Sequence, residues 1–104
     1  MMNKRSLNCN ELDNMSLLAR MQKGLKLFIE GHVTLDFEEN DLIIFLVNGE
    51  NDQYIVSFLD GIIRCNCLDY YNRWNRDYGS YICKHIWASI FQLIKIKFKK
   101  HFFY

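Results

Sequence analysis

Cys65-Asn66-Cys67 and Cys83-Lys84-His85, separated by residues 68–82, are the stretches that decide how this chain folds. Three thiolates and one imidazole make a complete tetrahedral ligand set for Zn²⁺, with no position left for a substrate or a catalytic water. Side chains two residues apart point to the same face of a strand, whereas two residues of a helix turn through about 200°. The spacing therefore predicts a closed, structural zinc site that joins the end of a strand to a helix with His85 in its first turn.

The cysteines also admit other interpretations. Cys65 and Cys67 could be buried apolar residues or a redox pair, but Cys-x-Cys is not the Cys-x-x-Cys redox motif. Neither interpretation accounts for Cys83 and His85. A reducing intracellular environment favours zinc over disulfides for clustered cysteines. The remaining thiol and imidazoles are interpreted as having no metal role: Cys9, His32 and His101.

The rest of the chain alternates between helical and extended patterns. Apolar residues recur at helical spacing over residues 10–30, where Gly31 provides a stop, and again over 84–98. The opposite side of the first helix gathers Arg20, Lys23 and Lys26, most simply a solvated face. Between these segments, the extended patterns occupy residues 33–37, 42–47, 53–59 and 62–65, with Asp60-Gly61 as a tight turn before the last. We therefore predict an α+β fold, with an N-terminal helix, a four-stranded antiparallel β-meander, and a zinc-bound Cys-x-Cys/Cys-x-His module ending in a C-terminal helix.

The length of 104 residues supports one domain, which would bury roughly 60–70% of its unfolded surface. We expect a single domain over residues 1–104, made of a helix (10–30), the meander (33–65), the zinc module with its helix (65–98) and a tail (99–104). The continuous apolar run at 42–47 predicts a strand buried on much of both faces. Gly24 inside the first helix costs about 1 kcal/mol relative to Ala, which indicates a close contact with another element.

The two couples resemble the SWIM-type zinc finger family, whose pattern is Cys-x-Cys, a loop of variable length, and Cys-x-His opening a helix. The resemblance covers roughly residues 20–94, as in a compact stand-alone SWIM domain. It includes Asp69-Tyr70 after the second Cys and Ile86 after the final His. Leu68 departs from the family, because a Pro is frequent there. The resemblance implies one structural zinc ion and DNA-associated work such as chromatin, transposition or recombination. It also implies a second possibility, an adaptor for a recombinase-like ATPase.

The charged residues are distributed unevenly along the chain, although its net charge is only +1. Residues 30–60 hold eight acidic residues and no Lys or Arg, whereas residues 61–104 hold eight basic residues against Asp69 and Asp77. The N-terminal stretch lacks the apolar segment of a secretory signal, and the apolar runs are too short to cross a bilayer. We therefore expect an intracellular protein, in the cytoplasm or at the nucleoid or nucleus.

We expect residues 68–82 to form a long loop, which interleaves five aromatic residues with Arg and Asn, and the helix after it carries a stripe of Lys. Aromatic side chains stack on nucleobases, and basic side chains neutralise phosphate. The same aromatic residues could instead cover the zinc site. We expect a mixed arrangement, with Tyr70 and Tyr81 inward and the Arg side chains outward. The candidate nucleic-acid or partner contacts are Arg73, Trp74, Arg76, Lys84, Lys95 and Lys99.

Two functions from different classes follow. The first is a non-catalytic module that binds nucleic acid, DNA above all, and the second is an adaptor that binds another protein. We do not expect an enzyme, because the sequence has no catalytic triad or phosphate-loop signature and the four zinc ligands leave no open position. Asp69 could accept a hydrogen bond from His85, cap a helix or form a turn. The aromatic tail at 99–104 could mediate self-association.

Overall fold

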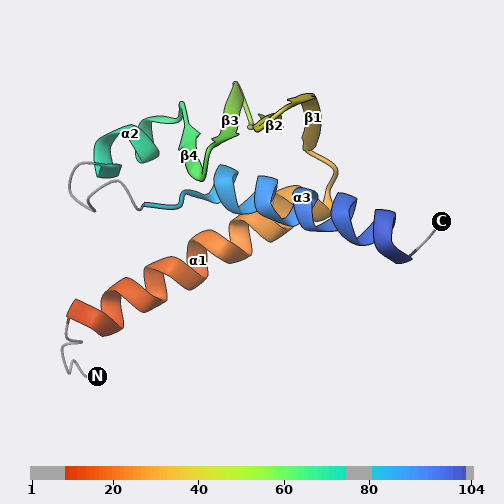
Figure 1. Ribbon diagram of the computed structural model, residues 1–104. Helices are drawn as coiled ribbons and strands as arrows, with labels where there is room; N and C mark the ends of the chain where they lie inside the picture. The colour runs from red at the N-terminus through yellow and green to blue at the C-terminus, as the bar shows by residue number, and fades with distance from the viewer. Residues whose placement is uncertain (1–8, 75–80, 103–104) are drawn as a thin grey trace.

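The computed structural model describes residues 9–74 and 81–102, with side chains described for 17–73 and 81–99. Two long helices lie on one side of a four-stranded sheet, and a short third helix lies beside its last strand (Figure 1). In chain order the elements are α1 (Cys9–Ile29), β1 (Val33–Glu39), β2 (Leu42–Asn48), β3 (Gln53–Leu59), β4 (Ile62–Cys65), α2 (Leu68–Trp74) and α3 (Lys84–Phe102). The predicted α+β class and the order of its elements are confirmed.

The sheet is an antiparallel meander in the order β1-β2-β3-β4. Its hairpin turns use backbone conformations that few residues adopt. Asp60 and Gly61 both have positive φ, 51° and 78°, which is the geometry of a two-residue turn between right-twisted strands. β1 carries an irregularity between Leu35 and Phe37, where its register against β2 shifts. The meander thus ends at Cys65, which pairs with Val56 of β3.

Three layers stack in the order sheet, α3, α1 (Figure 1). α3 contacts all four strands, and the side chains of Phe45, Val47 and Val56 are fully buried on the face of the sheet that it covers. α1 packs on α3 at Gly24, where an added Cβ would stand 2.5 Å from Cβ of Trp87. The predicted close contact at Gly24 is therefore confirmed. The described part of the chain contains no helix long and apolar enough to cross a membrane.

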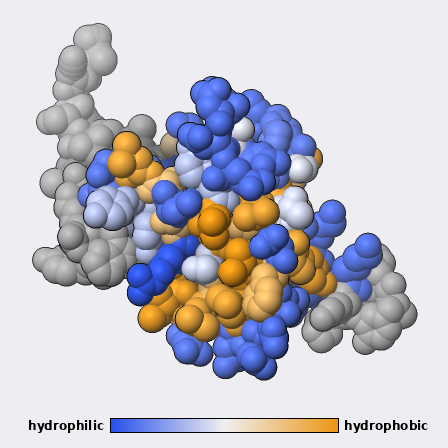
Figure 2. All heavy atoms as spheres, turned by 90° about the horizontal axis from the view of Figure 1, so that it is seen from above, coloured by the Kyte–Doolittle hydropathy of each residue, from blue (hydrophilic) through white to orange (hydrophobic). Residues whose placement is uncertain are grey.

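Two predictions about burial and local structure need correction. Residues 68–82 were predicted to form a loop, but residues 68–74 form helix α2. The strand over 42–47 was predicted to be buried on much of both faces, whereas its residues on the face opposite α3 are only partly buried. Among the described elements none covers that opposite face, and Figure 2 shows apolar side chains gathered there inside a polar rim.

Candidate metal centre

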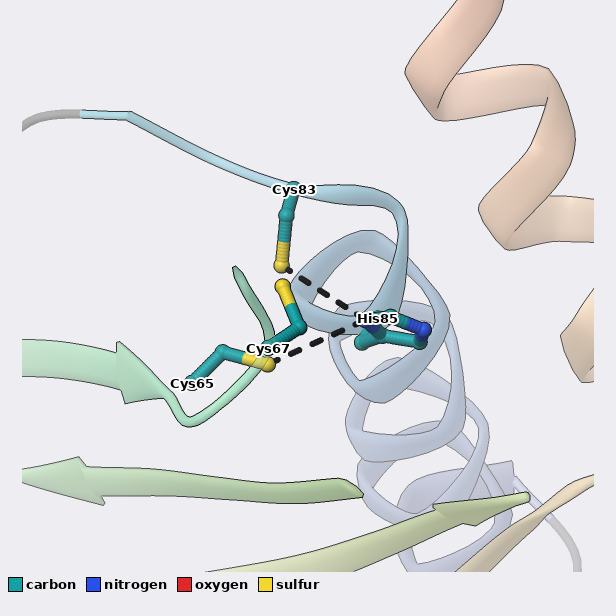
Figure 3. A group of neighbouring side chains, drawn as sticks. All are labelled: Cys65, Cys67, Cys83 and His85. Carbon is teal, nitrogen blue, oxygen red and sulfur yellow. Dashed lines mark hydrogen bonds between the residues drawn. The ribbon is translucent and has the colours of Figure 1, made fainter. Parts of the chain in front are cut away.

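The two couples converge on one point between the end of β4 and the start of α3 (Figure 3). The ligand atoms of Cys65, Cys67, Cys83 and His85 all lie within 4.8 Å of one another, and all four residues are buried. Nδ1 of His85 is 3.8 Å from Sγ of Cys65 and 4.0 Å from Sγ of Cys83. Tetrahedral Zn²⁺ with ordinary bond lengths holds sulfur and nitrogen ligands about 3.6 Å apart. The donor set and its size therefore fit one zinc ion in a closed, structural site.

Asn66, between the first two ligands, extends the sheet beyond the last residue of β4. Its backbone N–H donates to the carbonyl oxygen of Ile55 at 3.2 Å, and its side-chain oxygen accepts from the Ile55 N–H at 2.9 Å. These paired bonds fix the backbone between Cys65 and Cys67. Both sulfurs are consequently held on the side of the sheet that faces α3, as the two-residue spacing predicts.

The second ligand of the first couple and the first ligand of the second couple each stand immediately before a helix. The Tyr70 N–H of α2 donates to Sγ of Cys67 at 3.3 Å. The Ile86 N–H of α3 likewise acts on the Cys83 sulfur and favours its thiolate. Each sulfur occupies the place of an N-cap side chain, where unpaired N–H groups and the positive end of the helix dipole stabilise negative charge. Metal ligation and helix initiation therefore use the same two atoms.

Protons are shared unequally among the three thiols in the absence of metal. Hydrogen bonds from Cys65 and Cys83 hold the pKa of Cys67 far below its ordinary value. Hydrogen bonds with Cys67 and Cys83, together with burial, raise the pKa of Cys65. For Cys83 a hydrogen bond with Cys65 lowers the pKa, but a hydrogen bond with Cys67 and burial outweigh it and raise the pKa to about 12. Zinc binding must therefore displace thiol protons.

His85 is oriented by neighbours that the sequence analysis did not identify. The ring of Tyr54 in β3 stacks on the His85 imidazole, with centroids 4.2 Å apart and planes inclined by 26°. Tyr54 lies two residues before the buried Val56, so the alternation of the strand could have placed it on this face. The Ser89 hydroxyl donates to the His85 carbonyl oxygen at 3.0 Å. The imidazole is thereby held with Nδ1 toward the sulfurs, as Figure 3 shows.

The aromatic residues predicted to point inward, Tyr70 and Tyr81, are both buried, which confirms that expectation. Tyr70 donates its hydroxyl to the Ile63 carbonyl oxygen at 3.0 Å. Tyr81 donates to Asp69 at 2.5 Å, and burial and this bond raise its pKa to about 12. The structure gives Asp69 a partner that none of the roles considered for it included, the Tyr81 hydroxyl. The segment between the couples thus has a small core of its own.

Two arginines lie differently from the expectation. Arg20, assigned to a solvated face of the first helix, donates from Nε to the Ile82 carbonyl oxygen at 2.9 Å and lies 4.5 Å from the Tyr81 ring centre. Arg73, expected to point outward, is half-buried and lies 4.7 Å from the same ring. Both guanidinium groups find an electron-rich aromatic face beside a carboxylate. The Trp74 side chain and Arg76 lie outside the described residues.

The lysines of the two long helices come together beside the metal centre. Lys84, Lys95 and Lys99 are exposed on α3. A cleft of about 620 Å³ is lined on its helical side by Lys84, by Lys23 and Lys26 of α1, and by Glu30, whose carboxylate lies 4.0 Å from Nζ of Lys26. Lys23 and Lys26 were predicted to lie on a solvated face, because only the packing of α1 on α3 brings them next to Lys84. Glu50 and Asp52 of the β2–β3 connection line the opposite side.

A buried Cys₃His cluster at the junction of a strand and two helix starts is a structural zinc-binding module, and the described side chains around it are those of a packed core. No protein-family model, no curated protein and no solved structure matches this chain.

Proposed function

We propose that this zinc-binding module binds nucleic acid, DNA above all, through the lysines of α1 and α3, with zinc as a scaffold and no catalytic role. The observation that carries the proposal is the shared cleft, where Lys23 and Lys26 of one helix stand beside Lys84 of another. A cluster of lysines favours binding to DNA, because each phosphate that a lysine neutralises releases condensed counterions from the DNA. The zinc site fixes the start of α3 and thereby the place of Lys84.

The lysines of α3 continue this surface away from the metal. At 100° per residue, Lys84, Lys95 and Lys99 lie within about 60° of one another around the helix axis. They extend over about 22 Å, a length in which one strand of DNA presents about six phosphates. All three side chains are exposed. Lys97, in contrast, points toward the sheet, where its ammonium group lies 3.5 Å from Glu38.

The separation of acidic and basic residues indicates which side of the molecule would face nucleic acid. The acidic residues of 30–60 belong chiefly to the meander, whereas the lysines lie on the helical layer. Glu50 and Asp52 on the far side of the cleft repel phosphate, and on the helical side the Glu30 carboxylate lies 4.0 Å from Nζ of Lys26, so the proposed contacts at the cleft are centred on Lys23 and Lys84. The resemblance of the ligand couples to the SWIM-type zinc finger family supports the same function. Arg73 takes a smaller part than the sequence predicted, because its guanidinium group lies over Tyr81.

A salt titration of DNA binding by the zinc-loaded chain tests the proposal. Binding through several phosphates should make log K fall steeply and linearly with log salt. Lys84→Gln and Lys23→Gln should each weaken binding to all sequences and reduce the magnitude of the slope by about one. Lys97→Gln is the matched control, because it removes a lysine of the same helix that faces Glu38, and it should leave the slope unchanged.

The alternative function is a protein adaptor, which could serve a recombination or repair ATPase. The apolar face of the sheet, uncovered by any described element, is the observation that favours it. Absence of DNA binding, or an affinity that does not change with salt or with the lysine substitutions, would discard the nucleic-acid proposal in favour of this one. A preference for single-stranded DNA would indicate that bases stack on the aromatic residues of 68–82.

A further inference from the structure

The face of the sheet turned away from α3, which we call the outer face, is largely apolar and exposed. Phe37 is 40% exposed, Ile55 46%, Leu59 47% and Ile62 54%. A meander with one face on a core ordinarily carries polar residues on the other, because that face meets water. Contiguous apolar surface inside a polar rim, as in Figure 2, marks a site of association. The strand register assigns the members of the outer face in three rows: Phe37, Ile44, Ser57 and Arg64; Thr34, Leu46 and Ile55; Glu39, Leu42, Leu59 and Ile62.

The inner face of the same sheet shows what kind of element covers these strands. α3 contacts all four strands, and the side chains of Phe45 and Val56 are fully buried beneath it. At the edge of the sheet, Nζ of Lys97 in α3 lies 3.5 Å from a Glu38 carboxylate oxygen. Successive side chains of β1 alternate between the faces, so Glu39 belongs to the outer face. The inner cover is therefore an amphipathic helix with a basic side chain at an acidic edge, and the outer face presents the same two features without a described cover.

One end of the outer face has a lining that matches a lysine or arginine side chain. A shallow hollow of about 400 Å³ lies there between the β1–β2 and β3–β4 turns. A lysine stem covers apolar surface while its ammonium group reaches carboxylates, and Arg64, in the middle row, is not among the lining residues. The carboxylates disfavour an acidic segment at the same place. The apolar lining is Phe37, Leu42 and Leu59, and the carboxylates are those of Glu39, Asp41 and Asp60.

We propose that the outer face binds an amphipathic helix of another protein, whose apolar stripe lies on the strands and whose Lys or Arg side chains reach the carboxylates at the hollow. Charge complementarity selects this partner, because residues 30–60 hold eight acidic residues and no Lys or Arg. Four strands span about 19 Å, so a helix that crosses them as α3 does needs about 13 residues. A contact of this size belongs to the small, transient class of interfaces.

This contact goes beyond the proposed nucleic-acid function and does not rest on it. The lysines of α1 and α3 lie on the opposite side of the sheet, so both surfaces can be occupied at once (Figure 1). Lys84→Gln should therefore weaken DNA binding and leave binding of the helix unchanged. Failure of either proposal is visible without reference to the other.

Fluorescence anisotropy with model helices and the full, zinc-loaded chain tests the proposal. The probe is a labelled peptide of Leu and Lys, about 18 residues long, with Leu on one side of the helix and Lys on the other. A peptide with the same Leu positions and Glu in place of Lys should bind at least about tenfold more weakly. So should a Leu/Lys peptide of scrambled order, because its Leu residues no longer share one side.

Substitutions on the chain locate the binding to the outer face. Ile55→Gln and Leu59→Gln should each weaken binding of the Leu/Lys peptide at least about fivefold, because each removes apolar contact. Ile29→Gln is the matched control, since Ile29 is 70% exposed on α1 and should leave binding unchanged. Zinc content and helical circular dichroism verify that every variant remains folded.

Neutralised carboxylates test the charge complementarity separately. Glu39→Gln and Asp60→Asn should each weaken binding about threefold at low salt and less at high salt, because exposed charges are screened. Asn tolerates the positive φ of position 60, so the turn is kept. Glu50→Gln is the matched control: it removes the same charge from the β2–β3 connection, which lines the cleft on the helical side, and it should leave binding unchanged.

Three results would overturn the proposal. The first is equal binding of the Leu/Lys and Leu/Glu peptides, and the second is binding that survives both Ile55→Gln and Leu59→Gln. The third is a dimer of this chain that Leu59→Gln dissociates, because a second copy then occupies the outer face. Self-association was predicted for the aromatic tail at 99–104, whose side chains, apart from Lys99, lie outside those described.

Discussion

The meander from β1 to β3 and the segment from Cys65 to His85 lie against the same helix, α3, but different interactions hold them there. Three strands pair along their whole length and bury Phe45, Val47 and Val56 completely. In the metal segment the buried residues are the four ligands, Tyr70, and Tyr81. The ladder of backbone hydrogen bonds and apolar contacts stabilises the first region, whereas the second has a small core built around four ligands that a zinc ion would join.

The contrast indicates how a chain of 104 residues stabilises a fold with two helical layers on one side of a sheet. A small domain has little apolar surface to bury, and a structural metal supplies free energy that the core does not. The zinc ligands come from the end of the meander and from the start of α3. A bound zinc ion would therefore fix both the last strand and the helix that covers the sheet. The regions should therefore respond differently when the metal is removed, and equally when shared contacts with α3 are changed.

The largest effect is expected from loss of the metal. Chelation, or Cys83→Ser, should lower the thermal midpoint by more than about 10 °C, since zinc binding contributes on the order of 10 kcal/mol in small modules. Hydrogen exchange should show protection lost first over residues 65–90 and last in the β2–β3 pairing. Uniform loss of protection would contradict the distinction between the two regions. Cys9→Ser is the control and should retain one zinc ion per chain.

A smaller effect, about 1–3 kcal/mol, is expected from Gly24→Ala. The substitution ordinarily stabilises a helix by about 1 kcal/mol. Here the new Cβ would stand 2.5 Å from Cβ of Trp87 and 2.7 Å from the Lys84 carbonyl oxygen, so α1 and α3 must separate. Urea unfolding should show a lower midpoint with an unchanged slope. Gln22→Ala, at an exposed position of the same helix, should be neutral or stabilising, and equal behaviour of the two variants would refute this account.

Tyr81→Phe should cost about 1 kcal/mol, because it leaves Asp69 without the hydroxyl that donates to it at 2.5 Å. The loss should appear as faster hydrogen exchange between the ligand couples, with no change in the meander. Asp69→Asn, which keeps an acceptor, should cost less. Tyr71→Phe serves as the control, since Tyr71 is 78% exposed and should not alter stability. A change in β2 or β3 exchange would show that the regions are coupled more closely than their contacts indicate.

The smallest effect is expected at alkaline pH. Burial and the bond with Asp69 raise the pKa of Tyr81 from 10.0 to about 12, so between these values the unfolded chain loses a proton that the folded chain keeps. The contribution of Tyr81 is therefore present below pH 10 and declines as pH rises toward 12. Denaturant titrations across this window should show a steeper decline for the wild type than for Tyr81→Phe. Parallel curves would contradict the raised pKa.

The sequence predicted the elements whose patterns are local. The two couples identified all four members of the cluster, and Asp60-Gly61 identified its turn, because ligand spacing and turn chemistry operate over a few residues. Gly24 was predicted to make a close contact, but its partner Trp87 was not. Contacts between residues far apart in the chain produce no local sequence pattern that would predict them. Arg20 bonds to Ile82, 62 residues away, and nothing in the helical pattern around Arg20 distinguishes it from a solvated residue.

Helix α2 and the exposure of the sheet face opposite α3 were missed for different physical reasons. A helix of 7 residues is too short to show a reliable period or to be stable alone, and α2 begins because the Cys67 sulfur accepts a hydrogen bond from its Tyr70 N–H. The continuous apolar run of β2 is typical of a strand covered on both sides. Periodicity cannot reveal that the described part of the chain covers only one face of this strand, the face under α3.

The arrangement of the ligands also bears on how this chain could change in length. The metal site holds the ligand sulfurs of Cys67 and Cys83 within 4.8 Å of each other, and so fixes the two ends of the connection between them. Doubling the length of a connection with fixed ends adds only about 0.6 kcal/mol of closure entropy. An insertion between the couples that leaves helix α2 and Tyr81 in place should therefore cost little closure entropy, whether it is acquired in evolution or engineered as a reporter. The same insertion into the two-residue turn at Asp60-Gly61 would disrupt the register that brings Cys65 to the metal.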